Sequence, residues 1–434
     1  MPDMLFARTN GELIDFPGAR MAGMTGDNIL EPSEEELIPL PKGATITALP
    51  YRTPVGIDKE RGELINLSVN PYKRKKETIW AVGALLPQGF TRTYVPAYTS
   101  VQGQKTLPLL GYTAVGISRG QLVVAAVQTD EHFLWHPDNY NTADLEKRIM
   151  EKQKKFPRNR LLKQLGICSL KYGCFTAQNI FYGRWEGGIP VSPECNARCV
   201  GCISSQPAEC CPSPQGRLNF VPRVEEIEEI GVEHLKNGAK AIISFGQGCE
   251  GEPSLQGDLI GESIKRIRQQ TEQGTINMNT NAGHKLKMKK IIDAGIDSIR
   301  VSMISPTEEV YQAYHRPQNY QLGDVVESLI YARERGVYTS LNLLSFPGFN
   351  DDEGEIARLI DLLRKTGVKK VQFRNLNIDP DYFLSILPHK EYHPIGIPRM
   401  INVLKNELPH LEIGNYSRAV QKTMHSTKCI ADDE

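Results

Sequence analysis

The chain has 434 residues, too many for one average domain, so two or three domains are expected. Its 51 basic residues balance its 51 acidic ones, and this balance excludes a global field that would favour nucleic acid or an anionic membrane. No apolar run approaches the ~18 residues that a membrane span needs, and the acidic N-terminus lacks the apolar stretch of a signal peptide. We expect a cytoplasmic protein with no membrane partner, for which nucleic acid is disfavoured.

Residues 1–140 have the turn-rich pattern of β structure. The apolar run GQLVVAAVQ at 120–128 predicts a strand, and TPVGIDKERGELINLSV at 53–69 predicts two short strands around a turn. This region is predicted as a β-rich accessory domain that either recognises the substrate or covers the catalytic domain.

Residues 141–187 are predicted as a helical connector. The stretch from Thr142 to Leu165 is strongly charged and has helical spacing, with Pro157 as a break. Its basic excess is interpreted as a solvated face, because no aromatic residues are interleaved for base stacking.

Residues 188–380 alternate regularly between apolar strands and helices. Six strands are predicted, at 188–193, 241–246, 276–282, 298–305, 338–345 and 369–378. Short apolar strands that alternate with helices indicate a parallel sheet, here a partial (βα)6 barrel of the α/β class. Residues 381–434 are predicted as a short C-terminal extension. In such folds the chemistry lies at the carboxyl ends of the strands.

Three cysteines follow the first predicted strand as C-x3-C-x2-C: Cys195, Cys199 and Cys202. The chain has nine cysteines, an odd number in a long chain, which does not indicate a disulfide framework. A structural zinc site needs four Cys or His ligands. An iron–sulfur cluster with three protein thiolates leaves one iron open, which suits a loop at the catalytic edge of the sheet. We favour the open cluster; the candidates that would complete a zinc site are Cys210, Cys211 and His234.

This cysteine spacing, after the first strand of a βα array, resembles the radical S-adenosylmethionine (radical SAM) superfamily. The resemblance covers about residues 188–380 and implies one [4Fe–4S] cluster on Cys195, Cys199 and Cys202. It also implies that the amino and carboxylate groups of S-adenosylmethionine bind the fourth iron.

Other motifs are similar to the same family. Gly251-Glu252-Pro253 matches the element that meets the methionine ammonium, with Glu250 as a rival for that contact. Glycine lets backbone approach a ligand closely, and a carboxylate accepts a strong hydrogen bond from an ammonium.

The next two strands supply further candidates. By the resemblance, Asn281 in MNTNA lies near the cofactor, and Ser302 in IRVSMIS bonds the ribose or the carboxylate of S-adenosylmethionine. Arg300 lies two residues before Ser302 on the same strand face and is predicted to pair with the carboxylate; an ion pair to a helix is the alternative.

The family resemblance implies reductive cleavage of S-adenosylmethionine to a 5′-deoxyadenosyl radical, which abstracts hydrogen from a substrate. The partners implied are an external electron donor of the flavodoxin or ferredoxin type and a peptide, protein or small-molecule substrate. The alternative function is a non-catalytic zinc- or iron–sulfur-binding interaction module.

The remaining cysteines leave two questions open. Cys168, Cys174, Cys210 and Cys211 are the candidates for a second cluster, although free cysteines are more often small buried residues. Cys249 lies in the loop after the second predicted strand, where a thiol could donate hydrogen to a product radical. It is therefore the candidate catalytic residue, with simple packing as the alternative.

Overall fold

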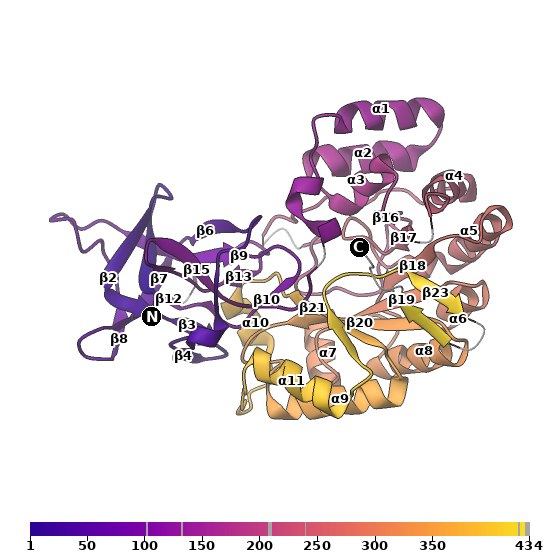
Figure 1. The fold of residues 1–434 in the computed structure, drawn as a ribbon. Coiled ribbons are helices and arrows are strands. Elements are labelled where there is room, and N and C mark those ends of the chain that lie inside the picture. Colours follow the sequence, from indigo (N-terminus) through magenta and orange to yellow (C-terminus); the bar gives the residue numbers. More distant parts are fainter. Residues whose placement is uncertain (101–102, 132, 207–210, 239, 424–425, 430–434) are drawn as a thin grey trace.

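The computed structural model describes residues 1–100, 103–131, 133–206, 211–238, 240–423 and 426–429. Figure 1 shows a β-rich N-terminal part, coloured indigo to purple, beside an α/β part that runs from magenta to yellow. The predicted class is confirmed: an α/β fold with a curled parallel sheet and an N-terminal β-rich region.

The N-terminal part is built on antiparallel sheets. Its larger sheet holds twelve strands within the described residues: β1 (Asp3–Arg8), β2 (Leu13–Met21), β5 (Leu37–Pro39), β6 (Thr45–Leu49), β7 (Arg52–Asp58), β8 (Leu64–Asn66), β9 (Ile79–Leu85), β10 (Phe90–Arg92), β12 (Tyr98–Ser100), β13 (Tyr112–Thr113), β14 (Val115–Ser118) and β15 (Gln121–Gln128). The smaller sheet consists of β3 (Gly23–Thr25), β4 (Asn28–Leu30) and β11 (Val95–Pro96). The strand predicted at 120–128 is β15, and the pair predicted within 53–69 is the antiparallel hairpin of β7 and β8.

Three helices connect this part to the next: α1 (Leu145–Lys155), α2 (Arg160–Lys171) and α3 (Phe175–Tyr182). The break predicted at Pro157 separates α1 from α2. Their inner faces belong to the same apolar core as the parallel sheet, through residues such as Leu161, Leu165 and Ile180. The described part of the chain also contains four short 3-10 turns: η1 (Glu34–Glu36), η2 (Phe133–Trp135), η3 (Pro137–Asn139) and η4 (Pro253–Gln256).

The core is a parallel sheet whose strands follow one another in chain order. They are β16 (Glu186–Gly188), β17 (Ile242–Phe245), β18 (Thr275–Thr280), β19 (Ser298–Met303), β20 (Tyr338–Ser345), β21 (Lys370–Asn375) and β22 (Glu412–Gly414). The helices of this part are α4 (Val224–Leu235), α5 (Gly257–Gln270), α6 (Lys285–Asp293), α7 (Glu308–His315), α8 (Leu322–Glu334), α9 (Glu353–Thr366), α10 (Pro380–Ile386) and α11 (Ile397–Glu407). A two-stranded ribbon, β23 (Val420–Thr423) and β24 (Ser426–Cys429), follows β22.

Two ends of the sheet differ from the sequence prediction. The first paired strand is Glu186–Gly188 rather than 188–193. Pro190 and Pro193 lack the N–H that a ladder requires, so the chain runs on without pairing after Ile189. A seventh strand, Glu412–Gly414, comes from the segment predicted as an extension. Its three residues are too few to show the alternation of apolar and polar side chains that predicts a strand.

The described strand pairs do not join β22 to β16, so the barrel is open on that side. Aromatic rings fill the gap. The Tyr416 ring stacks on Trp135 at 5.7 Å, and Trp135 lies 6.4 Å from Tyr140. Tyr140 in turn stacks on Phe175 at the start of α3. The segment around residues 135–140 therefore closes the barrel wall from outside the sheet.

Across the described ranges, no helix combines the length and the apolar character that crossing a membrane would require.

Candidate active site

A cavity of about 760 Å³ lies at the carboxyl ends of the core strands. Its walls come from the loop that carries the C-x3-C-x2-C motif, from the loop after β17, and from the inner faces of β18 to β21. The N-terminal part adds Leu86, Pro87, Gln88 and Phe90. The accessory region therefore forms part of the cavity wall.

The three motif cysteines are brought together at this cavity, as predicted. Their loop is pinned to the end of α7, because the N–H of Val200 donates to the Tyr314 carbonyl at 2.9 Å. Gly201 is required there, since a Cβ at this position would lie 2.6 Å from the Tyr314 hydroxyl. The Cys199 thiol contacts Nδ1 of His315 at 3.3 Å, and the Arg217 guanidinium donates to the Cys202 sulfur at 3.4 Å.

The raised pKa values of these thiols are consistent with a site that holds positively charged metal ions. Burial raises the pKa of Cys195 to about 11, with the Glu252 charge adding to the shift. Burial also raises the pKa of Cys199, and Cys195 and Cys202 raise it further. Three neighbouring thiolates repel one another unless positive charge lies between them, and ferrous or ferric ions supply that charge.

The residues considered for a zinc site have other surroundings. Within the residues that the structure describes, no three His, Cys, Asp or Glu side chains form a group suited to one metal ion. His234 is buried and its Nε2 lies 2.8 Å from the Trp185 carbonyl oxygen. Cys211 is buried in another apolar cluster, and Cys210 falls outside the described residues.

Glu250 and Glu252 follow β17, and their carboxylates have different partners. Glu250 accepts four backbone N–H groups: Oε2 from Val191 and Ser192, at 2.7 and 2.9 Å, and Oε1 from Gly246 and Gln247, both at 2.7 Å. These bonds tie the segment before the cysteines to β17. Burial raises the pKa of Glu250 to about 7, although the four N–H groups favour its charged form.

Glu252 has different hydrogen-bond partners. Its carboxylate accepts the N–H of Ser254 at 2.9 Å and that of Asn281 at 2.8 Å, and the Thr280 hydroxyl. Burial raises its pKa. Both glutamates line the cavity and are 4% exposed. The predicted contact of Glu252 with the cofactor ammonium stays a prediction.

Gly251 allows two chain segments to touch. A Cβ here would lie 1.9 Å from the Glu194 carbonyl oxygen, and its N–H donates to the Ser192 carbonyl at 2.7 Å. The close approach that glycine permits is therefore to the cysteine loop. Its predicted contact with the cofactor is not tested.

Asn281 and Ser302 both line the cavity. The Asn281 side chain donates to Oδ1 of Asn196 at 2.7 Å and accepts the Gly283 N–H at 2.9 Å, which ties it to the cysteine loop. Ser302 is half-buried. Their contacts with S-adenosylmethionine remain predictions.

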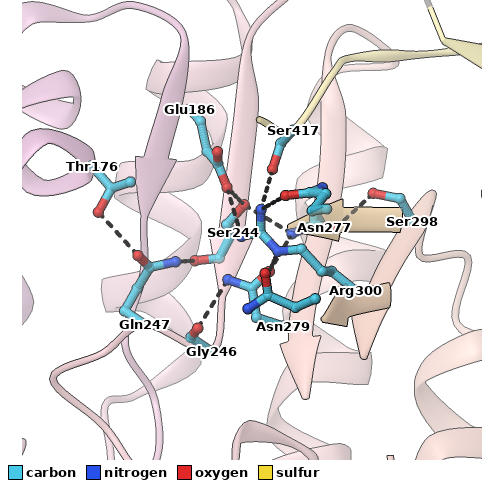
Figure 2. Close-up of polar contacts among 12 residues, drawn as sticks. Thr176, Glu186, Ser244, Gly246, Gln247, Asn277, Asn279, Ser298, Arg300 and Ser417 are labelled. Carbon is cyan, nitrogen blue, oxygen red and sulfur yellow. Dashed lines mark hydrogen bonds and ion pairs between the residues drawn. The ribbon is translucent and has the colours of Figure 1, made fainter. Parts of the chain in front are cut away.

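Arg300 belongs to a polar network with Glu186, Asn279 and Ser417 (Figure 2). Its Nε donates to Asn279 at 2.7 Å, and its Nη1 donates to Gln372 at 3.0 Å and to Ser417 at 2.7 Å. Its ion-pair partner is Glu186 of β16, at 3.5 Å, rather than a helix residue. Most of the guanidinium is therefore occupied by protein groups, and its predicted pairing with the cofactor carboxylate stays a prediction.

Sequence reasoning missed Arg374, which lines the same wall two strands from Arg300. Its Nε donates to Asn342 at 3.0 Å and its Nη2 to Gln372 at 3.2 Å. No carboxylate of the described residues forms an ion pair with it. Burial lowers its pKa to about 10, with Arg300 lowering it further. The alternation Gln372-Phe373-Arg374 was the available signal, since it places Gln372 and Arg374 on one face of the strand.

The predicted second-cluster cysteines do not gather as one group. Cys168 and Cys174 line the cavity, whereas Cys211 lies elsewhere. Cys249, the candidate catalytic residue, is buried on the same wall as Cys168.

Residues 189–360 match the family model described as the radical SAM superfamily. The chain contains a radical SAM domain. Members of this superfamily use a [4Fe–4S] cluster and S-adenosylmethionine. Cys195, Cys199 and Cys202 line the cavity, and their role as cluster ligands stays a prediction.

The chain is similar to several proteins named GTP 3′,8-cyclase. It is 32% identical to that of Aquifex aeolicus over 182 residues, which are 41% of this chain and 51% of the relative. It is 29% identical to that of Campylobacter lari over 195 residues, 45% of this chain and 55% of the relative. The chain thus spans about half the length of these radical SAM relatives.

Solved radical SAM structures resemble parts of the fold. Streptococcus suis SuiB bound to precursor peptide SuiA matches with a TM-score of 0.39 at 12% identity, over 58% of this chain and 54% of that one. The [FeFe]-hydrogenase maturase HydG from Carboxydothermus hydrogenoformans matches with a TM-score of 0.36 at 14% identity, over 65% and 70% of the two chains.

Proposed function

We propose that this radical SAM enzyme abstracts hydrogen from a small anionic metabolite bound in the cavity, and that a purine nucleotide such as GTP is the first candidate. The observation that carries the proposal is the unpaired guanidinium of Arg374 on the cavity wall. When bound, the cluster and S-adenosylmethionine supply the radical; the residues of the chain supply binding, orientation and shielding.

The charges on the sheet wall favour an anion. Arg300 and Arg374 face the cavity from neighbouring regions of the sheet, and Glu186 is the one carboxylate in ion-pair contact with either of them among the described residues. Arg374 is half-buried, and Glu186 and Asp130 act on its charge from a distance without forming an ion pair with it. A phosphate or carboxylate of the substrate would supply the missing charge, and the planar guanidinium binds such groups in a bidentate manner.

The other groups on this wall suit a polar substrate. The amides of Asn342 and Asn377 line the cavity, and Asn342 holds Arg374 in place. Phe90 and Leu344 add apolar surface. A few polar groups among apolar ones are typical of small-molecule sites, and the name of the relatives supports GTP as the first ligand to test.

The predicted cofactor residues line the same cavity. Cys195, Cys199 and Cys202 would hold the cluster, with Gly251, Glu252, Asn281 and Ser302 beside S-adenosylmethionine. Glu252 would accept from its ammonium. A substrate held by Arg374 would then share one cavity with the cofactor.

Binding of GTP to the anaerobic protein, measured by equilibrium dialysis, tests the proposal. We expect Arg374→Met to weaken binding about tenfold or more, Arg374→Lys to weaken it less, and the exposed Arg364→Met to leave it unchanged. GTP should also increase 5′-deoxyadenosine release under reductant. Equal release with and without GTP, together with unchanged binding in Arg374→Met, would reject GTP. The same pair of measurements with other phosphorylated and carboxylated metabolites then tests the anionic class.

A further inference from the structure

The loop that carries the three motif cysteines runs beside the residues that end α7. The N–H of Gln318 donates to the Asn196 carbonyl at 2.7 Å, and the N–H of Arg198 donates to the His315 carbonyl at 3.1 Å. The two segments also form an antiparallel bridge. A segment that is distant in the sequence therefore holds the cysteine loop through its backbone.

This backbone pairing places the His315 imidazole beside one of the motif cysteines. Nδ1 of His315 lies 3.3 Å from the Cys199 sulfur, and His315 is 2% exposed. Its ring packs against the rings of Tyr311 and Tyr314, at centroid distances of 4.5 and 5.0 Å. Nε2 has no hydrogen-bond partner among the described residues. Aromatic packing therefore fixes the imidazole with Nδ1 toward the sulfur.

The direction of this hydrogen bond follows from the chemistry of the two partners. A cysteine that binds iron is a thiolate, which has lone pairs but no proton and can only accept. A neutral imidazole has one N–H, and a proton on Nε2 would be buried without an acceptor, which is unfavourable. The proton therefore lies on Nδ1, where it meets the Cys199 sulfur.

The Cys202 sulfur also has a donor from outside the motif. Nη2 of Arg217 donates to this sulfur at 3.4 Å, and its Nε donates to the Ser204 hydroxyl at 3.2 Å. Because Arg217 brings a charge as well as a donor, the contact between His315 and Cys199 is the simpler one to test.

We propose that His315 is a positioning residue of the cluster, which donates from Nδ1 to the Cys199 thiolate and raises the reduction potential of the [4Fe–4S] cluster. The inference rests on the proposed radical function. A hydrogen bond to a ligand sulfur stabilises negative charge on the cluster, so the reduced state gains more from it than the oxidised state. The electron comes from the external flavodoxin- or ferredoxin-type carrier, and His315 neither gains nor loses a proton. The contact therefore makes reduction by this carrier more favourable.

An EPR-monitored redox titration of the anaerobically reconstituted full-length protein tests the proposal. His315→Leu removes the donor. His315→Asn keeps an N–H near the position of Nδ1, whereas His315→Gln places its amide near the position of Nε2. At a fixed potential we expect the ratio of reduced to oxidised cluster to fall roughly tenfold or more in His315→Leu and His315→Gln, which is about 59 mV for one electron. We expect His315→Asn and the exposed His410→Leu to stay close to wild type.

Equal potentials in wild type and His315→Leu overturn the proposal. A fall in His315→Asn as large as that in His315→Gln also overturns it, because the effect would not depend on where the donor lies. If His315→Leu binds no cluster, the two amide variants decide. Loss of the cluster in both of them assigns His315 a purely structural role and overturns the proposal.

The same samples separate this inference from the proposed function. Wild-type protein that holds a reducible cluster but releases no 5′-deoxyadenosine from S-adenosylmethionine rejects the radical function, while its potentials still report on His315. Wild-type protein that binds no cluster rejects both.

Discussion

Glu250 and Glu252 lie two residues apart in one loop, yet the surroundings of their carboxylates differ. Glu250 accepts four backbone N–H groups from two segments. Glu252 accepts two backbone N–H groups and one hydroxyl around the end of β18. Both carboxylates line the cavity, but the first ties the cysteine loop to the end of β17, whereas the second ties its own loop to the end of β18.

Substitution should separate these tasks. We expect Glu250→Gln to lower the free energy of unfolding by about 2–4 kcal/mol, because an amide NH2 would face N–H donors that have lost an acceptor. Iron content should fall with it. Glu252→Gln should keep iron near the wild-type level and weaken S-adenosylmethionine binding about tenfold, since a charge-assisted hydrogen bond is lost. Anaerobic iron analysis and equilibrium dialysis measure both. A folded Glu250→Gln protein that alone loses cofactor binding would reverse the two assignments.

The sequence could place the three motif cysteines in one loop but could not predict this division between the glutamates. Cys195, Cys199 and Cys202 are close in the chain, so their spacing alone places them together. The donors to Glu250 come from residues about sixty positions away, Val191 and Ser192, and from a turn whose geometry is set by folding. Arg374 was missed for a similar reason, since its role depends on which charges face it across the sheet.

At the scale of elements, α2 and α4 are joined by one buried carboxylate. Glu226 of α4 accepts from Nη2 of Arg160 at 2.6 Å and from the Arg160 N–H at 2.8 Å. It also accepts the N–H of Arg223 at 2.7 Å, which caps the start of α4. Arg160 and the two N–H groups lower the pKa of Glu226 to about 2, although burial opposes them.

These contacts of Glu226 predict that the free energy of unfolding depends on pH. Because the folded pKa lies below the ordinary value of 4.5, the contribution to stability is present above about pH 4.5 and is lost as the pH falls toward 2. Arg160 is 44% exposed, so solvent screens the pair and we expect only about 1 kcal/mol. Urea unfolding at pH 7 and pH 3 should show that loss in wild type. This loss should be absent in Glu226→Gln and present in the exposed Glu272→Gln. An equal pH effect in all three proteins would contradict the stabilising role of Glu226.

Most elements of the α/β part could be predicted because their periodicity is strong. The helices at Gly257–Gln270 and Glu353–Thr366 and the strand at Tyr338–Ser345 follow their apolar patterns. The strand Glu186–Gly188 could not, because its Glu-Gly-Gly sequence has low strand propensity and is held by its neighbours. Helix α3 was also missed, because its eight residues are apolar on most sides and show no period.

At the scale of the whole molecule, the N-terminal part is locked to the barrel by buried polar groups. Arg92 is fully buried and donates to the Leu376 carbonyl at 2.9 Å and to the Tyr112 carbonyl at 3.0 Å. Arg52 of β7 pairs with Asp379, which caps α10, at 2.8 Å. Since residues 86–90 also line the cavity, this contact holds part of the active-site wall in place.

The ion pair between Arg52 and Asp379 predicts a specific coupling between the two parts. The two side chains are 3% and 2% exposed, so Arg52→Met leaves a carboxylate buried without its cation and should cost about 3–5 kcal/mol. Asp379→Asn keeps an oxygen for the helix cap, and the double variant should lose at least about 1 kcal/mol less than the sum of the single ones. Denaturant unfolding of the four proteins measures this coupling, and Lys147→Met, at an exposed pair, should change nothing measurable. Additive losses would mean that the pair does not hold the N-terminal part on the barrel. If it does, Arg52→Met should also release more 5′-deoxyadenosine without substrate, because a loosened wall admits solvent to the cavity.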